Sequence, residues 1–153
     1  MHPSPEIARL VPHRGSMCLH ERVLSWSPTR VELATGSHRC VDNPLRRDGR
    51  LHAIHLCEYG AQAMAVHGGL CAAAAGKASA PGFLVALRTV ELHERYVDQL
   101  DGELVVAAEQ LLESPDSLQY SFVVRHLDRI LAQGRAAVVL HAKTTFDPAT
   151  GAA

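Results

Sequence analysis

The sequence has no marked excess of either charge, because 15 Lys and Arg residues and 16 Asp and Glu residues give a formal net charge of −1. A chain this close to neutrality offers no basic surface for nucleic acid or for an anionic membrane. It also lacks a continuous apolar run near the N-terminus, so no secretory signal peptide is expected. We therefore expect a cytoplasmic protein whose partners include no nucleic acid and no membrane.

Cys-x-x-Cys pairs are absent among the four cysteines, and free thiols are the expected state without a secretory signal. The His-Glu-x-x-His pattern of zinc enzymes is absent as well, because His52, His55 and Glu58 are spaced by three residues. We expect no metal and no other cofactor.

Residues 51–75 (LHAIHLCEYGAQAMAVHGGLCAAAA) are mostly apolar or small, and Glu58 is their only acidic residue. A helix this apolar on all sides is usually buried, so a buried helix is predicted from about Leu51 to Ala74. A buried carboxylate must be paired, protonated or functional. His55 and Gln62, three residues before and four after Glu58, can share its helical face. A carboxyl beside an imidazole in apolar surroundings is typical of acid–base catalysis, and a structural carboxyl is the alternative.

Turn signals such as Ser27-Pro28-Thr29 and Asp101-Gly102 separate strand-like segments on both sides of this helix. The segments are residues 17–26, 30–35, 83–93, 103–112, 118–125 and 131–143. Two strands, one long helix and four strands predict an α+β protein with a single domain over residues 1–153. An antiparallel sheet of five to six strands wrapped around one long central helix is the hotdog fold.

Several segments also carry a resemblance to a known family: LVPHR at residues 10–14, MCLHERVL at 17–24, EYGAQAMA at 58–65 and PGFLVA at 81–86. With these motifs the chain resembles the hotdog-fold 3-hydroxyacyl-acyl-carrier-protein dehydratases of fatty-acid synthesis. Among them it resembles the dehydratase-like proteins of aryl polyene gene clusters. The resemblance covers nearly the whole chain and implies that Glu58 is the catalytic acid.

One departure concerns the base. The fatty-acid enzymes carry a catalytic histidine in a loop ahead of the helix, and Pro44 stands at the corresponding place here. If this chain is catalytic, a partner subunit supplies the base or another histidine serves. His13 is the first candidate, followed by His55 and then His52. A structural role for His13 in the N-terminal turn is the alternative.

The resemblance implies elimination of water from a 3-hydroxyacyl thioester of an acyl carrier protein or of coenzyme A. Gln62, Gly49, Arg50 and Arg46 are the expected substrate contacts. Backbone N–H groups near Gly49 would face the enolate oxygen. The arginines would meet an acidic carrier protein or a phosphopantetheine phosphate, unless they form only a solvated loop.

Hotdog proteins of this kind dimerise, so a homodimer or higher oligomer is expected, with a second hotdog subunit as a further possibility. Two other functions remain open at this point. In a hotdog thioesterase Glu58 would suffice alone, and the missing loop histidine would cause no difficulty. In a heteromeric dehydratase the chain would be a non-catalytic partner subunit.

Overall fold

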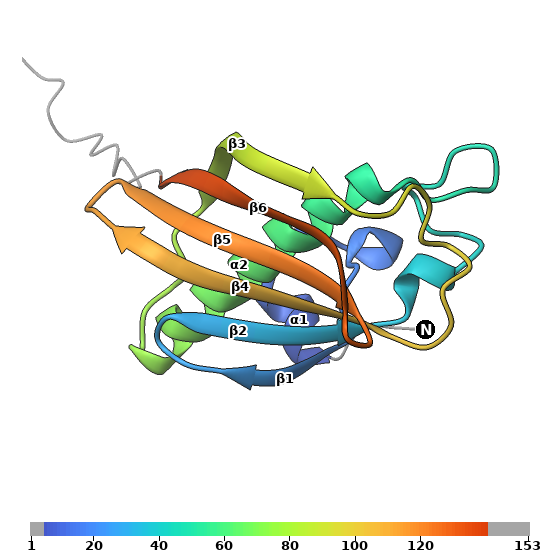
Figure 1. The fold of residues 1–153 in the computed structure, drawn as a ribbon. Helices are drawn as coiled ribbons and strands as arrows, with labels where there is room; N and C mark the ends of the chain where they lie inside the picture. The colour runs from blue at the N-terminus through green and yellow to red at the C-terminus, as the bar shows by residue number, and fades with distance from the viewer. Residues whose placement is uncertain (1–4, 141–153) are drawn as a thin grey trace, which may run out of the picture.

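The computed structural model describes residues 5–140, in which one antiparallel sheet of six strands curves around a single long helix (Figure 1). The strands are β1 (Arg22–Trp26), β2 (Arg30–Thr35), β3 (Gly82–Leu92), β4 (Leu104–Glu113), β5 (Ser117–His126) and β6 (Arg129–Leu140), and the helices are α1 (Pro5–Leu10) and α2 (Leu56–Ala74). The predicted α+β hotdog fold is confirmed. The expected continuation of the last strand over residues 141–143 lies outside the described residues.

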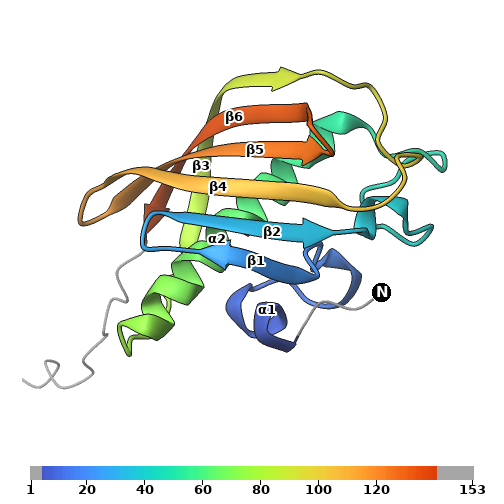
Figure 2. The same ribbon diagram turned by 60° about the horizontal axis from the view of Figure 1, so that its bottom comes forward.

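The strands follow the order β1-β2-β4-β5-β6-β3 across the sheet, as Figure 2 shows. Each neighbouring pair is antiparallel. β1 and β3 are therefore the two edges, although β3 stands in the middle of the sequence. The short helix α1 packs against α2.

The long helix begins at Leu56, five residues later than the sequence suggests. Residues Ala53–His55 form a 3-10 turn, and the His52 side chain caps it by accepting the N–H of Ile54 at 3.0 Å. Upstream of this turn, the Leu51 N–H donates to Asp98 Oδ1 at 2.9 Å. The backbone near Leu51 is held by a distant segment, and this tertiary contact overrides the local helical pattern.

Close packing between α2 and the sheet depends on Gly60. A Cβ atom at this position would lie 2.6 Å from Cγ of Phe122, which is buried on β5. The same ring would meet a Cβ atom at Gly134 on β6 at 2.9 Å. The ring of Phe122 thus fills the space that the two glycines leave, and helix and sheet share one core.

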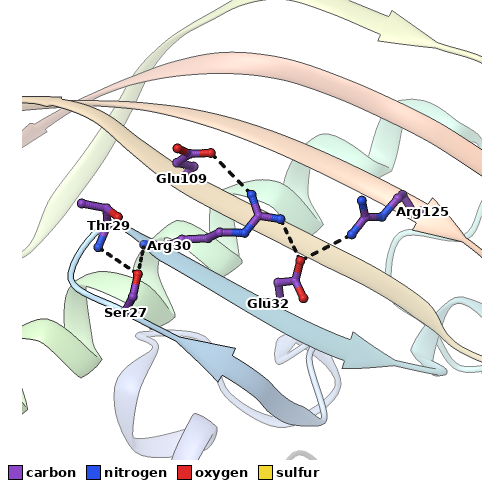
Figure 3. A network of polar contacts seen from close by, with 6 residues as sticks. All are labelled: Ser27, Thr29, Arg30, Glu32, Glu109 and Arg125. Atoms are coloured by element: carbon purple, nitrogen blue, oxygen red, sulfur yellow. Dashed lines mark hydrogen bonds and ion pairs between the residues drawn. The ribbon is translucent and has the colours of Figure 1, made fainter.

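The sheet face that points away from α2 carries charged side chains. Arg30 donates to Glu32 at 2.7 Å and to Glu109 at 3.4 Å, and Arg125 donates to Glu32 at 3.4 Å (Figure 3). At the turn before β2, the Ser27 hydroxyl accepts the N–H of Arg30 at 3.2 Å. One sheet face packs on the helix and the other meets solvent, which explains the alternation along β2 and β5.

The edge strand β3 differs from the other strands because apolar side chains remain exposed along it. The exposed fractions are 53% for Phe83, 43% for Leu84, 58% for Val85 and 39% for Leu87. We call these four residues the β3 edge. A long apolar edge of this kind is a template for pairing with another chain.

Candidate active site

Glu58 lies in the first turn of α2, on a flank of the helix that the sheet does not cover. Its side chain is 33% exposed, so the expectation of a largely buried carboxyl is wrong for the single chain. The sequence pattern misled here for a physical reason. With Ala and Gly on every side of α2, composition alone cannot tell which face meets the sheet.

Gln62 holds the carboxyl of Glu58 from one turn further along the helix. Its amide nitrogen donates to Glu58 Oε1 at 3.0 Å and to the carbonyl of Met17 at 2.7 Å. Its amide oxygen accepts the N–H of Leu19 at 3.0 Å, and the residue is 1% exposed. We expected Gln62 to contact substrate, but both ends of its amide are bonded within the chain.

His13 reaches the same carboxyl from the loop after α1. Its Nε2 lies 3.2 Å from Glu58 Oε1, and its side chain is 31% exposed. The other ring nitrogen, Nδ1, is buried and has no hydrogen-bond partner among the described residues. The structure therefore brings His13, from the loop after α1, together with Glu58 and Gln62 on α2.

The backbone that carries Met17 and Leu19 is itself fixed by side chains of β2 and the turn after it. Thr35 Oγ1 and Ser37 Oγ both donate to the carbonyl of Leu19, at 2.5 Å and 2.7 Å. This support could not be predicted from the sequence, because hydroxyl side chains near a strand end are common. As a result, the N–H of Leu19 and the carbonyl of Met17, which bond to Gln62, are held in place.

His20 and Tyr59 form a second support beneath the site. His20 Nε2 donates to the carbonyl of Tyr59 at 2.7 Å, and burial lowers the pKa of His20 to about 4. The Tyr59 hydroxyl lies 2.9 Å from Ser37 Oγ and accepts from Asn43 at 3.0 Å, and burial raises its pKa to about 12. Both groups are neutral at physiological pH, and their hydrogen bonds support the backbone beneath the site.

His55 and His52 lie elsewhere. Both line a cavity of about 220 Å³ together with Arg47, Asp48, Arg50 and Tyr96. Burial, and then the charges of Arg47 and His52, lower the pKa of His55. Among residues 5–140, no hydrogen bond or ion pair joins His55 to Glu58. The helical spacing does not apply to His55, because it belongs to the 3-10 turn and α2 starts one residue later.

Arg46 and Gly49 hold their own loop together. Arg46 donates to the carbonyl of Gly49 at 2.8 Å and to the carbonyl of Arg39 at 2.9 Å. Gly49 has a φ of +74°, in a turn well before the first residue of α2. Its backbone is therefore not part of the helix N-terminus, where we expected the enolate donors.

Arg50 pairs with Asp98 at 2.9 Å and stacks on the Tyr96 ring at 4.2 Å. Burial alone would raise the pKa of Asp98, but hydrogen bonds from Leu51 and Arg50 hold it below its usual range. This pair anchors the segment before α2, and no motif in the sequence indicated a role for Asp98.

Within the described part of the chain, no group of three His, Cys, Asp or Glu side chains could hold a metal ion. No helix there has the length and apolarity to cross a membrane.

A six-stranded antiparallel sheet around one long helix, with a carboxylate and a histidine meeting near the start of that helix, defines a hotdog-fold protein. Residues 5–147 match the model of the ApeP-like family, described as ApeP dehydratase. The chain belongs to the ApeP-like dehydratase family, which confirms the resemblance seen in the sequence motifs.

Solved structures support the same placement. The dehydratase heterocomplex ApeI:P from Xenorhabdus doucetiae is similar with 25% identity and a TM-score of 0.80, covering 94% of each chain. A hypothetical thioesterase with coenzyme A from Streptococcus pneumoniae has 11% identity, a TM-score of 0.59 and coverage of 79% of this chain and 85% of that chain. AziG from S. sahachiroi has 16% identity, a TM-score of 0.63 and coverage of 86% and 98%. The latter two show the shared fold alone. No curated protein matches the sequence.

Proposed function

We propose that the protein eliminates water from a 3-hydroxyacyl thioester, with Glu58 as the catalytic carboxyl. The observation that carries this proposal is the fixed and accessible carboxylate near the start of α2, with Gln62 and His13 on one of its oxygens. Elimination requires removal of the proton next to the thioester carbonyl and protonation of the leaving hydroxyl. A carboxyl held in place but open on one side suits proton transfer to a bound substrate.

An activity assay of the purified protein tests the proposal. The substrates are 3-hydroxyacyl, enoyl and saturated acyl thioesters, each on acyl carrier protein and on coenzyme A. A dehydratase interconverts the first two and leaves the saturated thioester intact. The comparison of the two carriers also establishes the substrate class. Release of free thiol from the saturated thioester would instead identify a thioesterase.

The thioesterase is retained as a second candidate on one observation. The loop before α2 contains no histidine from Cys40 to Leu51, so the part of the chain that carries the base in the fatty-acid enzymes has none here. A single carboxylate that activates water needs no such residue. The saturated acyl thioester separates this candidate from the dehydratase directly.

We also infer that the protein works as an assembly with a second hotdog subunit, either its own copy or a related chain. The β3 edge supports this, because its apolar side chains stay exposed while β3 pairs with β6 on only one side. Neither the cavity beside His55 nor the larger hollow beside Asp101 is lined by Glu58 or His13. A second subunit at the β3 edge would bury that surface and could add walls to the site.

A further inference from the structure

We propose that the two oxygens of Glu58 have different tasks: Oε1 accepts a hydrogen bond from Gln62 and lies 3.2 Å from His13 Nε2, and Oε2 alone exchanges protons with the substrate. His13 is then a positioning residue and not the general base. This inference rests on the proposed dehydratase function. It concerns the residues that serve that function and not the substrate they act on.

The first step of the argument is the orientation of the Gln62 amide. The N–H of Leu19 can only donate, so the amide atom that faces it at 3.0 Å must be the oxygen. The NH₂ group therefore points to the other side, where the Met17 carbonyl and Glu58 Oε1 accept its two hydrogens. Because Gln62 is buried and both its ends are bonded, this orientation cannot invert without loss of all three bonds.

The second step is the tautomer of His13. A neutral imidazole carries its proton on one nitrogen only, and Nδ1 of His13 is buried without a partner. A buried N–H without an acceptor costs more than a buried lone pair without a donor, as the rarity of orphaned N–H groups shows. The proton therefore resides on Nε2, which faces Glu58 Oε1 at 3.2 Å.

These two steps leave Oε1 hydrogen-bonded to the Gln62 amide and 3.2 Å from the Nε2–H group of His13. A proton gained by Glu58 must sit on Oε2, which makes no hydrogen bond among the described residues. His13 has no free lone pair that a substrate can reach, because Nε2 bears the proton and Nδ1 is buried. The chain thus presents one proton-transfer atom, Oε2, with Gln62 hydrogen-bonded to the other oxygen and His13 beside it.

One oxygen suffices for elimination when the proton and the hydroxyl leave from the same face of the substrate. Oε2 of the carboxylate takes the proton next to the carbonyl, and the electrons of that C–H bond form the enolate. The enolate then re-forms the carbonyl as the carbon–oxygen bond of the 3-hydroxyl breaks, and Oε2–H gives its proton to the departing oxygen. The products are the enoyl thioester and water, and Glu58 returns to its carboxylate form.

The test compares His13→Gln with His13→Phe in the full chain, assayed with and without a second hotdog subunit. Glutamine can still present an N–H group to Oε1 but cannot accept a proton, whereas phenylalanine can do neither. We expect His13→Gln to keep kcat within about 3-fold of the unmodified protein and to keep its pH profile, because only a donor is required. We expect His13→Phe to lower kcat by about 10- to 100-fold, because the carboxyl loses part of its alignment.

Nitrogen NMR of the His13 ring gives a readout that is independent of activity. At neutral pH we expect Nε2 to be protonated and Nδ1 to be unprotonated. Gln62→Met extends the test to the other donor, with an expected loss in kcat of about 100-fold and an unfolding measurement to show that the variant is folded.

A dehydratase whose His13→Gln and His13→Phe variants lose activity equally, by about 10² or more, would overturn the inference and restore His13 as the base. A proton on Nδ1 in the NMR spectrum would overturn it as well. If the unmodified protein forms no enoyl product with either carrier, alone or with a second subunit, the proposed function itself fails, and the inference fails with it.

Discussion

The carboxyl of Glu58 has the clearest consequence at the scale of single residues. Glu58→Gln keeps the size of the side chain and replaces one carboxylate oxygen with an amide nitrogen that cannot exchange protons. We expect dehydration to fall by about 10²- to 10⁴-fold, the range for loss of a general acid or base. The thermal unfolding midpoint should change little, because the side chain is already one-third exposed.

The control is Glu113→Gln, which changes an exposed glutamate at the far end of β4. It should retain full activity under the same assay. Unimpaired turnover in the Glu58 variant would remove Glu58 from the mechanism.

His20 predicts how stability depends on pH. Burial lowers the pKa of His20 from 6.5 to about 4. Between pH 4 and pH 6.5, His20 therefore binds a proton in the unfolded chain but not in the folded chain. The stability it contributes is complete above pH 6.5 and is lost as the pH falls towards 4. At pH 5 the loss is about 2 kcal/mol.

Urea unfolding at pH 7.5 and pH 5.0 measures this loss, and His20→Gln should show a smaller difference between the two pH values. His38 and His67 also have a pKa lowered by burial, so part of the dependence will remain in the variant. Identical pH dependence in variant and unmodified protein would show that His20 is not responsible.

Part of this site was predictable from the sequence, and the rest was not. Gln62 beside Glu58 follows from a spacing of four on one helix, and the structure shows that contact. The approach of His13 is a long-range contact, and only the family resemblance singled it out. The carbonyl of Met17 and the N–H of Leu19 could not be foreseen, because every residue has such groups and only the fold decides where they point.

At the scale of elements, the packing of α2 on β5 makes a prediction with a control on the same helix. Gly60→Ala would place a methyl group 2.6 Å from the Phe122 ring and should destabilise the fold by about 1–3 kcal/mol. Gly68→Ala has nothing within 4 Å of its new Cβ and should stabilise the fold by about 0.5–1 kcal/mol, since alanine favours helix.

Chemical denaturation of both variants measures these opposite changes. Equal effects at the two positions would mean that helix propensity, rather than the contact with Phe122, governs Gly60. The existence of the strands and of α2, and their succession along the chain, were predictable from periodicity and turn residues. The start of α2 was not, because Leu51 and Asp98 meet only in the folded chain.

At the scale of the whole molecule, the exposed β3 edge predicts that subunits associate through this strand. Val85→Asp places a charge in the middle of an exposed apolar strand and should convert the assembly to monomers, because a buried unpaired carboxylate is costly. Leu24→Asp is the matched control on the other edge strand, β1, where Leu24 is 43% exposed. Light scattering at micromolar concentration distinguishes the two, and we expect Leu24→Asp to leave the assembly intact.

A protein that is already monomeric in isolation would require co-expression with a second hotdog subunit, and Val85→Asp should then prevent co-purification. An intact assembly in the Val85 variant would place the interface elsewhere. The exposed state of this strand was not foreseen from its sequence, because Phe83 to Leu87 reads equally well as the centre of a sheet. Only the strand order shows that it is an edge.

The same strand order has a consequence for synthesis of the protein on the ribosome. Among residues 5–140, β3 pairs only with β6, so both β4 and β5 must be made before β3 can acquire this neighbour. Throughout that interval the apolar residues of β3 lack β6 beside them. The nascent chain is then most exposed to aggregation and to chaperones, and a premature stop before Arg129 would leave β3 without any partner strand of its own.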